Sequence, residues 1–280
     1  SKGSLSFQKS KSPSIVVKSR GIFIITYHIM QQTIVVKIGT ESLEDFESSQ
    51  KVHTLVSDIA QSIRDGVHII LVTSGSVGFG RKTLWVEKHP QEHKPSLAAI
   101  GWDVLMSSYR QKFSQHQIHV AGFLVTHADI ADKSERRTMI QESIRTCLDQ
   151  GILPIVNEND PLSIEEIDAL GRGGDNDQNA LLIAQCFQAQ DLVLITNTNG
   201  VYGNPSDPLS RITKIHSQDL SDDMINELCS GKSTTGTGGM ASKLRVWREA
   251  GESGIRVHIC NGIDSGLCDT SNGGTTIYPI

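Results

Sequence analysis

Short runs of continuous apolar residues recur along the chain and alternate with stretches that carry an apolar residue at every third or fourth position. The runs are typical of strands buried on both faces, and the wider spacing, as in residues 48–64, is typical of a helix packed on one side. This alternation predicts an α/β fold, a three-layer αβα sandwich with a mainly parallel central sheet. The runs predicted as strands are residues 34–38, 68–72, 118–125, 152–156, 191–196 and 255–260.

The first 32 residues differ in composition from the rest. The first twenty carry five lysine or arginine residues and no acidic residue, and an apolar patch follows at 22–25. This patch is too short for a secretory signal, and residues 26–28 offer no small-residue cleavage site. We interpret residues 1–32 as an N-terminal extension, either disordered or a peripheral arm, with Met30 as a candidate natural start. Residues 33–280 are predicted to form one domain.

Composition and charge narrow the classes of function. Of the 280 residues, 38% are hydrophobic and 20% are charged, as in an ordinary soluble domain. The net charge of -5 argues against nucleic acid as a partner. No apolar run approaches the roughly 18 residues of a membrane span, which argues against a membrane partner. The five cysteines show no metal-binding spacing and favour a reduced, cytoplasmic compartment, and the histidines do not cluster as metal ligands.

Polar and glycine-rich residues follow four of the predicted strands. In parallel sheets the carboxyl ends of the strands meet at one edge, and ligands bind there. Turns also favour glycine, asparagine and serine, so one such strand end would carry little information. Four of them, together with the loop at residues 236–243, predict a shared active cleft. The stretches are residues 37–40, 73–75, 157–160 and 196–200.

A glycine- and threonine-rich loop, residues 231–239, leads directly into a pattern with helical spacing. Such a loop exposes unpaired backbone N–H groups beside the positive end of a helix dipole, which suits a phosphate. Lys243 lies in the expected first turn, where a cation opposes the dipole unless an anion is bound. From this stretch alone, a phosphate site and a flexible surface loop are equally open.

Several common motifs fail. Residues 75–83 come near a P-loop, but Arg81 stands where lysine should follow the glycine, and Asn226 replaces the first glycine of a second near-match at 231–233. No GxGxxG follows the first strand, and GxSxG is absent. These failures argue against a Walker-type enzyme, a nicotinamide enzyme and an esterase.

Six sequence blocks in this order resemble the amino acid kinase family. They extend over nearly the whole chain after residue 33, and NEND followed by GDND is most similar to the members that phosphorylate glutamate. Many members carry a C-terminal PUA domain, for which this chain leaves no room. The blocks are VVKIGT (35–40), VTSGSVGFG (72–80), PIVNENDP (154–161), GGDNDQNALLIA (173–184), ITNTNGVYGNP (195–205) and GTGGMASK (236–243).

The resemblance implies ATP-dependent phosphorylation of the γ-carboxylate of L-glutamate, the first step of proline biosynthesis, with Mg²⁺ bound through the nucleotide phosphates. It also implies feedback inhibition by L-proline and a homo-oligomer, a dimer or a tetramer. By position, Lys37 and Lys243 flank the transferring phosphoryl group, and Asp177 holds the two lysines in place. The matching glutamate-contacting positions are Ser74, Asp160 and Asn176. The matching nucleotide-binding positions are Thr196, Asn197, Thr237, Gly238, Gly239, Met240, Ala241, Ser242 and Lys243.

The residue types agree with this chemistry. A glutamate side chain, with an ordinary pKa of about 4.3, is ionised at neutral pH and needs no general base. The reaction instead needs two mutually repelling anions to be aligned and the charge on the phosphoryl oxygens to be covered. Two lysines, backbone amides and Mg²⁺ meet that need. Lys37 within an apolar strand is hard to explain as a purely structural residue, because a buried lysine without an anionic partner is costly.

Simpler interpretations of some of these residues stay open. Asp175 and Asp177 also suit the cap of a helix that starts near Asn176. Asn157 and Asn159 also suit a turn.

Departures from the family pattern leave alternatives for the function. Asn197 stands where the family usually has aspartate, so nucleotide affinity and base preference are open. Residues 164–174 have the composition of a mobile lid. The alternatives are another kinase of this family, acting on aspartate, acetylglutamate, carbamate or a nucleotide, and a non-catalytic amino-acid sensor.

Overall fold

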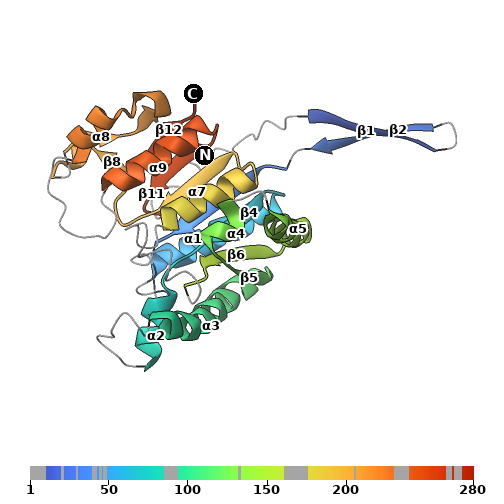
Figure 1. Ribbon diagram of the computed structural model, residues 1–280, viewed down its shortest axis with the longest axis horizontal. Coiled ribbons are helices and arrows are strands. Elements are labelled where there is room, and N and C mark those ends of the chain that lie inside the picture. The colour runs from blue at the N-terminus through green and yellow to red at the C-terminus, as the bar shows by residue number, and fades with distance from the viewer. Residues whose placement is uncertain are drawn as a thin grey trace, which may run out of the picture. The chain divides into compact units, whose positions relative to one another are not determined.

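The chain divides into two compact units, Ser1–Gln32 and Thr33–Ile280 (Figure 1). In the first unit, β1 (Lys11–Ser19) pairs with β2 (Ile22–Ile29) as an antiparallel hairpin. The computed structural model describes residues 11–19, 22–29, 31–39, 43, 46, 49–84, 94–131, 134–160, 176–204, 206–229, 240–262, 267 and 273–280.

The second unit is built on an eight-stranded sheet in the order β10-β12-β11-β7-β3-β4-β6-β5. The six strands from β11 to β5 are parallel, and only the β11–β12 pair is antiparallel. The strands are β3 (Thr33–Ile38), β4 (His68–Val72), β5 (Val120–Val125), β6 (Leu153–Glu158), β7 (Asp191–Ile195), β10 (Lys214–His216), β11 (Arg256–Cys260) and β12 (Thr275–Tyr278).

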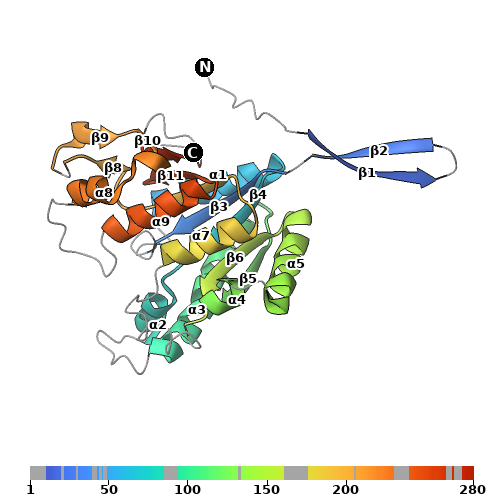
Figure 2. The same cartoon turned by 45° about the horizontal axis from the view of Figure 1, so that its top comes forward.

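Helices cover both faces of this sheet. Side chains alternate along β3, so Val35 packs on one side with α7 and α9, whereas Ile34 and Val36 pack on the other with α1 and α3. Figure 2 shows α7 and α9 lying side by side on the same face. The helices are α1 (Gln50–Arg64), α2 (Ser76–Leu84), α3 (Lys94–Ser114), α4 (His127–Ala131), α5 (Glu135–Asp149), α7 (Asn176–Cys186), α8 (Asp222–Cys229) and α9 (Met240–Glu252).

The predicted three-layer α/β architecture with a mainly parallel sheet is confirmed. The sequence pattern did not reveal the reversed strands β10 and β12, nor the small pair β8 (Val201–Tyr202) and β9 (Arg211–Ile212). These strands have two to four residues, too few to establish a period. Among the described residues, no helix is long and apolar enough to cross a membrane.

The amino-terminal edge of the sheet is held by a buried carboxylate. Asp191, at the start of β7, is fully buried and lies 2.9 Å from Arg256 Nε and 2.8 Å from His258 Nε2, both on β11. Burial raises the pKa of Asp191, but its contacts with His258 and Arg256 outweigh burial and hold the pKa below its ordinary value. This contact fixes two parallel strands at the edge where they begin.

Two glycines allow α2 and α3 to cross at very short range. A Cβ on Gly101 would lie 1.7 Å from the carbonyl oxygen of Ser76, and one on Gly80 would lie 2.0 Å from that of Leu97. Ser76 is the first residue of α2, which begins after a short turn that follows β4. The close crossing therefore sets the position of the turn between β4 and α2.

We predict that Gly101→Ala destabilises the protein by at least about 1–3 kcal/mol, because the added methyl group overlaps backbone atoms that cannot move independently. Urea unfolding measures this change. Gly78→Ala is the matched control, since a Cβ there meets nothing within 4 Å. In a helix that control should be neutral or stabilising by up to about 1 kcal/mol. Equal stability of the two variants would contradict the account of the crossing.

Candidate active site

A buried carboxylate joins two lysines from distant parts of the chain. Asp177 lies in the first turn of α7, and Lys37 Nζ on β3 lies 2.6 Å from its Oδ1. Lys243 Nζ, in the first turn of α9, donates to Oδ2 of the same carboxylate. Only 9% of the Lys37 side chain and 3% of the Asp177 side chain are exposed, compared with 31% for Lys243. The structure thus brings together the two lysines that the resemblance places beside the transferring phosphoryl group and the carboxylate expected to hold them.

The charges of this cluster do not cancel. Burial raises the pKa of Asp177, but attraction to Lys37 and Lys243 and their hydrogen bonds outweigh it and hold the pKa below its ordinary value. One carboxylate therefore faces two ammonium groups and leaves an excess positive charge, with Lys243 partly open to solvent. An excess positive charge at a strand-end edge attracts an anion. Because two lysines bind both oxygens of Asp177, this carboxylate does more than cap α7.

The predicted glutamate-contacting residues lie on one side of this cluster. Ser74 lies two residues after the end of β4, is buried, and donates to the carbonyl oxygen of Ile38 at 3.2 Å. Asp160 follows β6; burial raises the pKa of its carboxyl group, and the charge of Lys94 opposes that rise. Asn176 begins α7, and its side chain is outside the described residues. The order β3-β4-β6 places Ser74 and Asp160, whereas Asn176 is placed by α7, directly before Asp177.

The predicted nucleotide-binding residues that the structure describes lie on the other side. Thr196 directly follows β7, its amide donates to Cys260 O at 2.9 Å, and its hydroxyl donates to Thr198 O at 2.6 Å. Asn197 is exposed on the turn that follows. Met240, Ala241 and Ser242 form the start of α9. Thr237, Gly238 and Gly239 lie outside the described residues, as do Asp175 and the predicted lid at 164–174.

The structure adds two buried contacts beneath the Ser74 turn. Asn157 Nδ2, on β6, donates to Ser76 Oγ at 2.7 Å, and both side chains are buried. Thr73 and Tyr109 share a hydrogen bond of 2.8 Å between their hydroxyl groups. Asn157 therefore ties β6 to the start of α2, a function beyond shaping a turn. Sequence reasoning missed this contact because 81 residues separate its partners.

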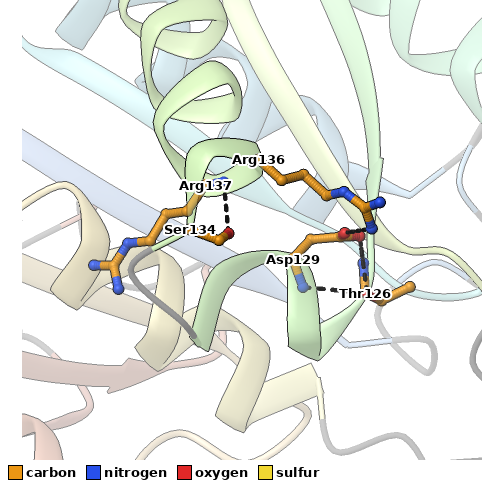
Figure 3. Close-up of polar contacts among 5 residues, drawn as sticks. All are labelled: Thr126, Asp129, Ser134, Arg136 and Arg137. Carbon is orange, nitrogen blue, oxygen red and sulfur yellow. Dashed lines mark hydrogen bonds and ion pairs between the residues drawn. The ribbon is translucent and has the colours of Figure 1, made fainter.

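A further polar cluster at the carboxyl end of β5 is internally satisfied (Figure 3). The Thr126 amide donates to Asp129 Oδ2 at 2.7 Å, the Asp129 amide donates to Thr126 Oγ1 at 3.2 Å, and Arg136 donates to Asp129 Oδ1 at 2.8 Å. Ser134 Oγ accepts from the Arg137 amide and caps α5, while the Arg137 side chain points away from Asp129. These contacts cap α4 and α5 and fix the edge of the sheet beside the site.

Comparison with known proteins places the chain in a family. Residues 32–261 match the model of the amino acid kinase family. The chain belongs to this family. It is 33% identical over 235 residues to a glutamate 5-kinase of Streptococcus agalactiae, an alignment that covers 82% of this chain and 88% of the relative. It is 34% identical over 257 residues to a glutamate 5-kinase of Synechococcus sp., with 88% and 69% covered.

A solved structure supports the fold. Carbamate kinase from Giardia lamblia, bound to AMP-PNP, superposes with a TM-score of 0.62 at 15% sequence identity, covering 90% of this chain and 99% of that one. At this identity the likeness concerns the fold alone. The expected amino acid kinase fold is confirmed.

Asp177→Asn should lower the free energy of unfolding at neutral pH by about 3 kcal/mol, because it leaves Lys37 buried without its anionic partner. The folded-state pKa of Asp177 lies below the ordinary value of 3.8. Its stabilisation is therefore complete above that value and is lost as the pH falls through the folded-state pKa. The difference in the free energy of unfolding between wild type and variant should decrease over that pH range.

Urea unfolding of both proteins from neutral pH to below 3.8 measures this difference. Asp103→Asn, an exposed position on α3, is the control and should leave stability unchanged. A difference that is absent at neutral pH, or that stays constant down to low pH, would contradict the proposed charge pairing.

Proposed function

We propose that this protein transfers the γ-phosphoryl group of ATP to the γ-carboxylate of L-glutamate, producing γ-glutamyl phosphate and ADP, the first step towards proline. The observation that carries the proposal is the Lys37–Asp177–Lys243 cluster at the carboxyl edge of the parallel strands. Its support is the 33% identity to a glutamate 5-kinase along 88% of that relative's length.

The reaction needs positioned charge rather than a base. An ionised γ-carboxylate oxygen attacks the γ-phosphorus and forms the new P–O bond. The bond to the bridging oxygen breaks, and its electron pair leaves with ADP. Negative charge spreads over the three equatorial oxygens, and Lys37 and Lys243 lie where two cations can cover it.

Asp177 keeps these two cations in register. Each carboxylate oxygen accepts a hydrogen bond from one ammonium group, so the two nitrogens are held close to each other. Lys37 is buried near the carboxyl end of the interior strand β3, whereas Lys243 is partly exposed and is the one able to follow the phosphoryl group. Such preorganisation lowers the cost of reorganising charge in the transition state.

Strand order separates the two substrates. Ser74 and Asp160 follow β4 and β6 on one side of β3, and Thr196 and α9 lie on the side of β7 and β11. A half-buried carboxylate at Asp160 suits the α-ammonium group of a free amino acid. The amide of N-acetylglutamate has no such charge, so this position favours glutamate over its acetylated form.

Mg²⁺ fits this site as a companion of the nucleotide. Among the described residues, no three His, Cys, Asp or Glu side chains are grouped to hold a metal ion, and both oxygens of Asp177 are bound by lysines. The residues thus suit a metal bound through the phosphates, where it would neutralise phosphate charge. Cys147, Cys186 and Cys229 are free thiols, which supports a reduced cytoplasmic setting.

The test is hydroxylamine trapping of the acyl phosphate with ATP, Mg²⁺ and one of L-glutamate, L-aspartate or N-acetylglutamate. We expect hydroxamate from glutamate alone. Lys243→Ala should lower turnover at least about a hundredfold, the usual effect of losing one such donor, with the fold intact by circular dichroism. Arg245→Ala is the control, because this residue lies on the same helix and its 3.7 Å ion pair with Asp222 is exposed.

Each other outcome points to a named alternative. Product from a different acid indicates a sibling kinase of the family. Binding of ATP without product from any acid indicates an amino-acid sensor. Near-normal turnover of Lys243→Ala would contradict the assignment of the cluster.

Two regulatory and assembly properties belong to the same proposal. We expect L-proline to inhibit at or near the glutamate site, because it shares the α-amino and α-carboxyl groups that such a site must recognise. Inhibition should weaken as glutamate is raised, and turnover unaffected by saturating proline would remove this expectation. We also expect a dimer or a tetramer, and a monomer mass by light scattering would contradict that.

A further inference from the structure

A third lysine reaches the same edge of the sheet from the opposite helical layer. Lys51, in the first turn of α1, donates from Nζ to the carbonyl oxygen of Thr196 at 2.8 Å. Its Cε lies 3.9 Å from the position of a Cβ on Gly262, which follows β11. Lys51 therefore spans the ends of two neighbouring parallel strands, β7 and β11.

A lysine at this position does not stabilise α1. The first turn of α1 has no acidic residue, and Ser49 at its N-cap makes no side-chain capping bond. A cation in a first turn opposes the helix dipole. The contact of Lys51 with the strand end, rather than the stability of α1, accounts for a lysine at this position.

The contact lies next to the catalytic cluster. The carbonyl of Ile195 is 3.9 Å from the Cβ position of Gly39, which in turn is 3.8 Å from Lys37 Nζ. Lys37 Nζ and the Ile195 carbonyl thus both lie within 4 Å of the Gly39 Cβ position, and Lys51 binds the next carbonyl along the chain, that of Thr196. The Thr196 amide and hydroxyl are bound as well, to Cys260 O and Thr198 O, so each polar group of Thr196 has a partner.

We infer that Lys51 is a positioning residue for the nucleotide half of the site. By holding the Thr196 carbonyl, it fixes the turn of residues 196–200 before ATP arrives, which lowers the ordering cost of binding. The inference rests on the proposed function, since it takes ATP as the nucleotide on the side of β7 and β11. Lys51 therefore affects the binding of ATP and leaves the binding of glutamate, on the side of β4 and β6, unchanged.

The test replaces Lys51 with methionine, which keeps an unbranched stem but removes the donor. Lys51→Met should raise KM for ATP about tenfold and leave kcat and KM for glutamate within about twofold. Calorimetry with AMP-PNP should show the same loss of affinity. Lys51→Arg retains a donor and should restore most of it. Lys214→Met, at an exposed lysine of β10, is the matched control and should behave as wild type.

Two results would overturn the inference. One is wild-type affinity for ATP and AMP-PNP in Lys51→Met. The other is a lowered thermal midpoint with kcat and both KM values affected alike, which would indicate a structural role only. If wild type binds AMP-PNP but forms no glutamyl hydroxamate, the proposed function fails, and the calorimetric comparison still decides the role of Lys51. Wild type that binds no AMP-PNP overturns both.

Discussion

The two ion pairs of Asp177 are the interaction on which the site depends. Its carboxylate binds Lys37, 140 residues away, and Lys243, 66 residues away. It thereby links the central strand to two helices of one layer. Without it, Lys37 would be an unpaired charge in an apolar interior, and the distance between the ammonium groups of Lys37 and Lys243 would not be fixed by a shared partner. The carboxylate neutralises one of the two lysine charges, and the remaining positive charge can attract a phosphoryl group.

The sheet makes this arrangement possible because its order differs from the order of the chain. β3 lies at the centre, with β4 and β6 on one side and β7 and β11 on the other. The strand ends therefore divide into two halves around Lys37, one for an amino acid and one for a nucleotide in the proposed reaction. Asp191 ties the strands at the opposite edge, and the glycine crossing of α2 and α3 sets one turn at the working edge. The binding turns thus project from a rigid scaffold.

Much of the fold was predictable from local pattern. Six strands and the alternation with helices were expected from apolar periodicity alone, within a few residues of the observed bounds. The short strands β10 and β12 were not, because three or four residues carry no period and their pairing with β11 is set by distant contacts. The functional residues Lys37, Asp177 and Lys243 came from a resemblance in ordered motifs, and their roles in the reaction stay predictions.

The sequence by itself determined the fold class, the family likeness and the residues that follow each strand, because these depend on local spacing. Only the tertiary structure decided which of those residues meet. Asn157 with Ser76, Lys51 with Thr196 and Asp177 with both lysines are contacts across 66 to 145 residues. Strand order and helix placement set these pairings, and the sequence of no single segment determines either. The physical reason is that a polar side chain meets a partner distant in the sequence only when the whole sheet and its helices have packed.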